Sequence, residues 1–116
     1  MSLTYLTCEI ANPINGKKTS RKMLVDSGAV YSVVPASTLK KLHIDPIDKQ
    51  QFILANGEEI EKSIGEARFT IRDKSRVSPV VFGEENVWLL GATTLENMGL
   101  ILDPINRQLK SLPLTL

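Results

Sequence analysis

The sequence predicts a small, mostly β domain of the barrel type, and three observations support that prediction. Short runs of apolar and β-branched residues recur along the chain, which is typical of closely spaced strands. Two Asn-Gly dipeptides, Asn15-Gly16 and Asn56-Gly57, separate such runs, and Asn-Gly favours tight hairpin turns. One short segment near the C-terminus has clear signals at both ends of a helix. A chain of 116 residues is expected to form one domain, residues 1–116, around a single core.

The first part of the chain predicts a hairpin, a third strand and a short helix. These elements are expected, in order, at residues 4–10, 22–25, 31–34 and 36–42. Asn15-Gly16 predicts a type I′ turn in the hairpin, since both central residues of that turn need positive φ. Pro35 fits the first turn of the helix, where its missing N–H costs nothing.

The middle of the chain predicts a second hairpin with a polar tip. Its strands are expected at residues 51–55 and 58–64, around a second type I′ turn at Asn56-Gly57. The apolar positions then change phase at Gly65-Glu66, which predicts a β-bulge or a bend. A hairpin of this length is expected to project from the barrel as an arm.

The last third of the chain predicts strands on both sides of one helix. The strands are expected at residues 77–82, 87–90, 100–102, 108–112 and 114–116. The helix begins in a Thr93-to-Glu96 capping box, in which Thr93 is the N-cap and the Glu96 side chain reaches back. Gly99 is expected to supply its C-cap.

Composition gives no support to several classes of function. The net charge is +1, no apolar stretch could span a bilayer and no signal peptide is recognised, so neither nucleic acid nor membrane is an expected partner. Lys17-Lys18 and Arg21-Lys22 are interpreted as a solvated hairpin. The single cysteine, Cys8, cannot form an internal disulfide, which favours a reducing, cytoplasmic location.

The rarer side chains add no metal site or nucleophile. Cys8 and His43 are too few to hold zinc, and no metal or cofactor is expected. A serine or cysteine triad would need His43 as its base, but His43 follows a predicted helix in a polar segment and is interpreted as a surface or capping residue. Trp88 is interpreted as a core residue.

Asp26 is the remaining candidate for chemistry, within the run LVDSGAVYSVVP at residues 24–35. An Asp-Ser-Gly turn alone is common, because Asp caps its own backbone and glycine accepts positive φ. Here Leu24-Val25 and Ala29-Val30 are apolar, so the turn is expected to be buried. A buried carboxylate with no cation nearby needs another partner, such as a second carboxyl group that shares its proton.

These residues resemble the active-site loop of the retropepsin-like aspartic protease family, the single-domain retroviral type. The matching loop is Leu24–Ala29, and Trp88–Gly91 with the following helix and Leu100–Asp103 resembles the family's second signature. The hairpin between them resembles its flap. The resemblance covers residues 22–109 in the family's order, and bacterial and archaeal aspartyl proteases are the members that it resembles most.

The resemblance implies a small closed β-barrel of the acid-protease type, with one short C-terminal helix and a flap hairpin. It implies an aspartic endopeptidase in which two chains form a homodimer, each supplies one aspartate, and the pair activates a water that attacks an extended peptide. Asp26, Ser27 and Gly28 take the catalytic positions. The implied substrate contacts are Ala29, Val30, Ala55, Asn56, Gly57, Leu89, Leu90 and Gly91.

Two alternatives stay open: a non-catalytic peptide-binding or assembly module with the same fold, and a processed fragment of a larger polypeptide. The intact Asp26-Ser27-Gly28 favours the enzyme. Retroviral members often carry an acidic residue and an arginine, paired near the dimer interface, where this chain has Val30 and Ala92. That difference, together with a flap tip that holds Gly57 as its only glycine, favours the non-catalytic module.

Overall fold

The computed structural model describes residues 3–103, 105–113 and 116. Its elements, in chain order, are β1 (Tyr5–Ala11), β2 (Lys18–Val25), β3 (Ser32–Pro35), α1 (Ala36–Lys41), β4 (Asp48–Ile53), β5 (Glu59–Ile71), β6 (Lys74–Gly83), β7 (Leu89–Leu90), α2 (Ala92–Asn97), β8 (Leu100–Asp103) and β9 (Gln108–Ser111).

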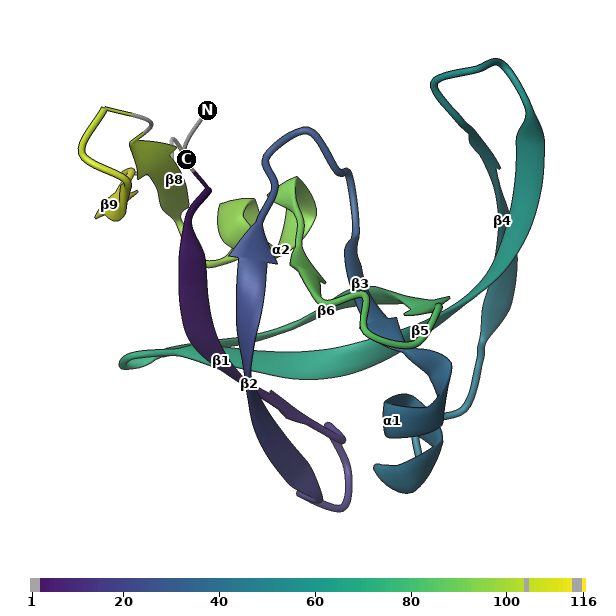
Figure 1. The fold of residues 1–116 in the computed structure, drawn as a ribbon. Coiled ribbons are helices and arrows are strands. Elements are labelled where there is room, and N and C mark those ends of the chain that lie inside the picture. The colour runs from purple at the N-terminus through teal and green to yellow at the C-terminus, as the bar shows by residue number, and fades with distance from the viewer. Residues whose placement is uncertain (1–2, 104, 114–115) are drawn as a thin grey trace.

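Six of the strands in the described part of the chain close into a ring (Figure 1). The order is β1-β2-β7-β3-β6-β5, and the ring closes because β1 also pairs with β5, from Glu9 opposite Thr70 to Ala11 opposite Arg68. The β2–β7 and β3–β6 pairs are parallel, whereas β1–β2 and β5–β6 are antiparallel. The predicted mostly β barrel is confirmed.

The predicted arm is the β4–β5 hairpin, which we call the flap. The first half of β5 pairs with β4, and the second half pairs with β6 in the barrel wall. The register stays one-to-one through Gly65, so the phase change there is a bend and not a bulge; Figure 1 shows β5 curving out of the barrel. A Cβ on Gly65 would lie 3.0 Å from the carbonyl oxygen of Asp45 and 3.0 Å from the Phe82 ring, so glycine allows this close approach.

Neither Asn-Gly turn is the predicted type I′ turn, because only the glycine of each has positive φ (75° at Gly16 and 88° at Gly57). Residues 12–17 connect the first hairpin, and the turn from Leu54 to Gly57 is closed by an N–H···O bond of 2.9 Å. Side chains explain the longer loops: Asn12 Oδ1 accepts from Ile14 N at 2.8 Å, and Asn56 Oδ1 accepts from Glu58 N at 2.9 Å. Such asparagine turns compete with the tightest hairpin geometry.

Helix α1 follows Pro35, as predicted, and ends before His43, an exposed residue with φ of 60°. The interpretation of His43 as a surface or capping residue is confirmed. Helix α2 ends at Asn97 with Met98 as its C-cap, and Gly99, the predicted C-cap, follows one residue later with φ of 68°. Its start differs, because Gly91 is the N-cap and neither Thr93 nor Glu96 forms the predicted capping box.

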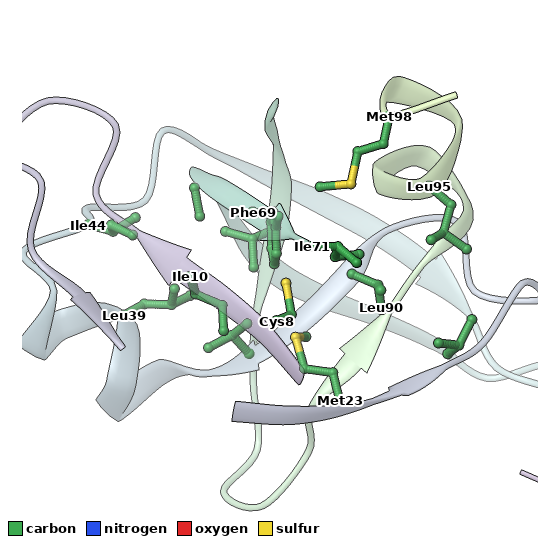
Figure 2. Packing of buried hydrophobic residues seen from close by; sticks show 14 of the residues in the cluster. Cys8, Ile10, Met23, Leu39, Ile44, Phe69, Ile71, Leu90, Leu95 and Met98 are labelled. Carbon is green, nitrogen blue, oxygen red and sulfur yellow. The ribbon is translucent and has the colours of Figure 1, made fainter. Parts of the chain in front are cut away.

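The core fills the barrel interior (Figure 2). Cys8, Ile10, Met23 and Phe69 are fully buried inside the ring, while both helices add side chains at its ends. The buried apolar side chains of the helices are Leu39 from α1 and Leu95 from α2, and α2 also buries the polar Thr94. Trp88 was predicted to be a core residue, but it is half-buried and packs against the edge of the core.

The end of the chain forms a separate two-stranded sheet, β8–β9. Its turn is held by Asp103, whose carboxylate accepts a bond from Asn106 and pairs with Lys110 at 3.0 Å. The hydrogen bond from Lys110, followed by that from Asn106, holds the pKa of Asp103 well below its usual range. The strand predicted at 114–116 falls largely on residues 114 and 115, outside the described residues.

Within the described ranges, no helix combines the length and the hydrophobicity needed to cross a bilayer.

Candidate active site

The Asp26 loop begins where β2 ends, and its own backbone sets the position of the carboxylate. The Asp26 N–H donates to the carbonyl oxygen of Leu90 at 3.0 Å, which joins the loop to β7. Gly28 N donates to Asp26 Oδ1 at 3.0 Å, and Ala29 N donates to the Asp26 carbonyl at 3.1 Å. A Cβ on Gly28 would lie 3.2 Å from Asp26 Oδ1. The tight turn therefore directs one carboxylate oxygen toward the loop backbone.

The second signature supports this loop from behind. Strand β7 lies between β2 and β3, with Leu89 opposite both Leu24 and Val33. A Cβ on Gly91 would lie only 2.5 Å from the carbonyl carbon of Tyr31. Only a residue without a side chain fits that crossing without displacing the backbone.

The loop also explains why α2 needs no side-chain cap. Two N–H groups at the start of the helix, those of Ala92 and Thr93, donate to the carbonyls of Ala29 and Val30 at 2.8 and 2.9 Å. The first turn of a helix otherwise leaves such donors without partners. Backbone carbonyls of the Asp26 loop therefore accept the hydrogen bonds of the first N–H groups of α2.

A buried hydroxyl network, which the sequence analysis did not identify, links the same segments. Ser32 Oγ accepts from Gly91 N at 2.9 Å and lies 2.6 Å from the Thr94 hydroxyl. Thr94 Oγ1 in turn lies 2.9 Å from Ser78 Oγ. All three side chains are buried, and each has a hydrogen-bonding partner, so their burial carries no unsatisfied group. The signal in the sequence is a hydroxyl residue inside each of three apolar segments.

The expected burial of the Asp26 turn is wrong for a single chain. Asp26 is half-buried, Ser27 and Gly28 are exposed, and Val30 is 63% exposed. The apolar residues on the two sides of the turn differ, because Val25 lies in the barrel wall while Val30 faces solvent. Among the described residues, no ion pair includes Asp26.

A cavity of about 420 Å³ lies between the Asp26 loop and the flap. The loop contributes Gly28, Ala29 and Val30, and the flap contributes mainly apolar side chains. The full lining is Gly28, Ala29, Val30, Tyr31, Val33, Phe52, Ile53, Leu54, Ile60, Lys62, Val81, Gly83, Glu84 and Val87. The walls are therefore suited to an apolar side chain.

Two contacts join the flap to the rest of this cavity. The rings of Tyr31 and Phe52 meet edge to face, with centroids 6.2 Å apart and planes at 88°. Lys62 of the flap pairs with Glu84 at 2.9 Å, and its hydrogen bond lowers the pKa of that carboxyl group. The first contact holds the outer part of β4 against the β2–β3 connection, and the second joins the middle of the flap to the residue that follows β6.

The residues implied as substrate contacts fall into three groups. Ala29 and Val30 line the cavity, whereas Ala55, Asn56 and Gly57 are exposed at the flap tip and lie outside its lining. Leu89, Leu90 and Gly91 also lie outside the lining; Leu90 and Gly91 are buried behind the loop.

The sequence analysis did not identify the flap side chains that face the cavity. These are Phe52, Ile53, Leu54, Ile60 and Lys62. The sequence carries their signal as apolar residues in a hairpin that is otherwise rich in polar ones.

Other reactive groups do not enter this site. Cys8 is fully buried in the core, and burial raises the pKa of its thiol to about 12, so it stays protonated and unreactive near neutral pH. In the residues that the structure describes, no group of three or more His, Cys, Asp or Glu side chains is placed to hold a metal ion.

Comparison with known proteins gives the class. A family model described as "Aspartyl protease" matches residues 10–101, and the chain belongs to that family. Among solved structures, it is similar to the solution structure of Simian Foamy Virus (mac) protease, with a TM-score of 0.58 and 22% sequence identity over 80% of this chain and 92% of that one. The retropepsin-type fold is thereby confirmed. A search of curated proteins finds no match.

Proposed function

We propose that this member of the aspartyl protease family is an endopeptidase whose active site is completed by two copies of the chain. The observation that carries the proposal is the placement of Asp26, which is half-buried, fixed by its own loop and next to an apolar cavity under a hairpin. One chain supplies one such aspartate. A second chain would bring the second carboxyl group that water activation needs.

The proposed chemistry follows from two carboxyl groups in contact. They cannot both ionise cheaply, so they hold one proton between them. The ionised group takes a proton from a water molecule, and the neutral one donates to the oxygen of the scissile carbonyl as the water attacks its carbon. The exposed Ser27 hydroxyl would brace the two loops across the dimer axis. Gly28 and Ala29 would let the peptide backbone approach closely.

Exposed apolar side chains near the loop support the dimer. Val30 is accompanied by Leu3, Tyr5, Ile101 and Leu112, each about half exposed. The start of the chain is tied to the loop, because Val25 N donates to the carbonyl of Thr4 at 2.8 Å. Figure 1 shows the β2–β3 connection, the start of β1 and the β8–β9 sheet at the same side of the barrel. Burial of these side chains by a second copy would stabilise the dimer. This dimer would lack the ion pair that retroviral members form near their interface.

The apolar lining of the cavity supports an apolar side chain of the peptide next to the cleaved bond. Strand β4 is the last strand in the order of the seven-stranded sheet, so one of its edges has no partner strand among the described residues. An extended peptide could pair with that edge. The flap would then close over the peptide and exclude water.

Asp26→Asn tests the proposal. Wild-type protein should cleave a mixture of unstructured peptides without added metal, and Asp26→Asn should lose at least about a thousandfold in rate because the shared proton is lost. Asp73→Asn is the matched control, since Asp73 is exposed on the turn between β5 and β6. Its activity should equal that of the wild type.

A dilution series tests the dimer in the same assay. Activity per chain should fall in parallel with the dimer fraction measured by sedimentation. Cleavage by Asp26→Asn, or by a strictly monomeric wild type, would contradict the proposal. Wild-type protein that binds peptides without cleaving them would instead indicate the non-catalytic module.

A further inference from the structure

A second cavity, which we call the basic cleft, lies between the β1–β2 hairpin and α1. Its volume is about 440 Å³, and its cationic residues are Lys17, Lys18, Arg21 and Lys41. Trp88 and Leu42 supply its apolar surface. In Figure 1 the turn of the β1–β2 hairpin and α1 lie at one end of the barrel, and the β2–β3 connection and the flap tip lie at the other. The basic cleft is therefore a separate site from the Asp26 cavity.

No acidic side chain among the residues that line the basic cleft neutralises its positive charge. Four of the 14 lysines and arginines line it, and no lining residue is acidic, although the whole chain has a net charge of only +1. Of the ion pairs in the described part of the chain, one touches it: Lys18 lies 3.6 Å from Glu9, with both side chains substantially exposed. Exposed pairs of this kind are weak, so the local positive potential persists.

Residues with several kinds of hydrogen-bond donor line the same cleft. The guanidinium of Arg21 lies over the Trp88 ring, 4.7 Å from its centroid, which orders the arginine by a cation–π contact. The hydroxyl residues Thr19, Ser20 and Thr38 are also among the residues that line the cleft. Strand β2 pairs with β7 only at Leu24 and Val25, so the earlier part of that edge has no partner strand.

A simpler explanation accounts for part of this arrangement. Lysines on an exposed edge such as that of β2 prevent pairing with other chains, and Lys17 and Lys18 fit that role. It does not account for Lys41, which comes from α1, or for Trp88, which precedes β7. Asn12 fixes the hairpin against the end of α1 by donating to the carbonyls of Leu42 and His43, each at 3.0 Å. The cleft is thus a built concavity between three segments.

We infer that the basic cleft binds a small anionic molecule with at least two adjacent negative charges, of the phosphate-ester or oligophosphate class. Lysine, arginine and hydroxyl donors together match the several acceptor oxygens of such groups. The cleft volume lies in the range of small-molecule sites. The free phosphate chain and a phosphorylated nucleoside share this chemistry, and only the second would also use the apolar surface of Trp88 and Leu42.

Trp88 makes the test direct, because it is the only tryptophan in the chain. The full-length protein is titrated with pyrophosphate and with adenosine triphosphate, while tryptophan fluorescence and calorimetry are followed. Saturable binding that weakens as salt is added is expected with both ligands. Equal affinities would support recognition of the phosphates alone, and tighter binding of the nucleotide would support an added contact with the apolar surface.

Lys41→Gln and Lys40→Gln form the matched pair of variants. Both remove one charge from α1, but only Lys41 lines the cleft. We expect about tenfold weaker binding for Lys41→Gln, the effect of one lost charged hydrogen bond, and little change for Lys40→Gln. Equal losses in the two variants would overturn the inference. So would the absence of saturable binding, or binding of an acidic peptide without binding of pyrophosphate.

Discussion

Gly91→Ala tests how the second signature supports the Asp26 loop. The added methyl group would lie 2.5 and 2.6 Å from the carbonyl carbon and oxygen of Tyr31 and 2.8 Å from Ser32 N. Ordinary contacts start at 3.4 Å, so these backbone atoms would have to move by about 0.6–0.9 Å. The atoms of Tyr31 and Ser32 that would clash belong to the main chain, so no side-chain rotation can relieve the clash.

The expected loss of stability has two parts. Overpacking of this kind costs about 1–3 kcal/mol. Shifting the crossing also strains the bond from Gly91 N to Ser32 Oγ and the one from Ala92 N to the Ala29 carbonyl, and each bond contributes about 1 kcal/mol. If both bonds are lost, we expect the free energy of unfolding to fall by about 3–5 kcal/mol.

Urea unfolding measures this loss. The midpoint should fall while the slope with urea stays constant, because the folded state still buries the same surface. Gly16→Ala is the control: Gly16 has φ of 75° and open space around it, so its substitution should cost only the strain of positive φ, about 1–2 kcal/mol. A Gly91→Ala protein as stable as Gly16→Ala would refute the role assigned to the crossing.

Two further predictions concern the flap tip and the core thiol. Gly57→Val places a β-branched residue at φ of 88° with nothing within 4 Å; it should cost about 1–3 kcal/mol in local strain and leave the fold intact, while peptide hydrolysis falls. An equally active variant, by the peptide assay, would show that the tip is not a lid. Because the folded pKa of Cys8 is raised from 9.0 to about 12, the folded chain keeps a proton that the unfolded chain releases above pH 9. Its contribution to stability is full below that pH and is lost as the pH rises toward 12, with a slope of up to about 1.4 kcal/mol per pH unit. Urea unfolding of the wild type and Cys8→Ala across this window should show a steeper decline for the wild type, and parallel declines would contradict the assignment.

The sequence was sufficient for the elements whose signals are local. Pro35 and Gly99 marked the start of α1 and the end of α2, and Asn56-Gly57 between two strand runs located the flap. The barrel class also followed, because many short strands joined by turns can bury their apolar faces when the sheet closes on itself.

Signals that depend on distant partners were interpreted incorrectly. Thr93 resembles an N-cap, but the carbonyls of Ala29 and Val30 already satisfy the start of α2, and no local pattern reveals that. The exposure of Asp26 likewise depends on which way Val30 faces. The cavity residues were missed for the same reason, since Phe52 meets Tyr31 only after the flap folds over the barrel.

The contacts that complete the Asp26 loop join segments far apart in the chain. Ser32 and Gly91 are separated by 59 residues, and Ser32 and Thr94 by 62. Closing such long loops is entropically costly and slow. During synthesis, the segment that contains Gly91 and Thr94 must therefore leave the ribosome before the aspartate can acquire its final surroundings. Nascent chains in which Gly91 and Thr94 are not yet available would carry the Asp-Ser-Gly sequence without its geometry, so any peptidase activity can begin only after these residues have folded against the loop.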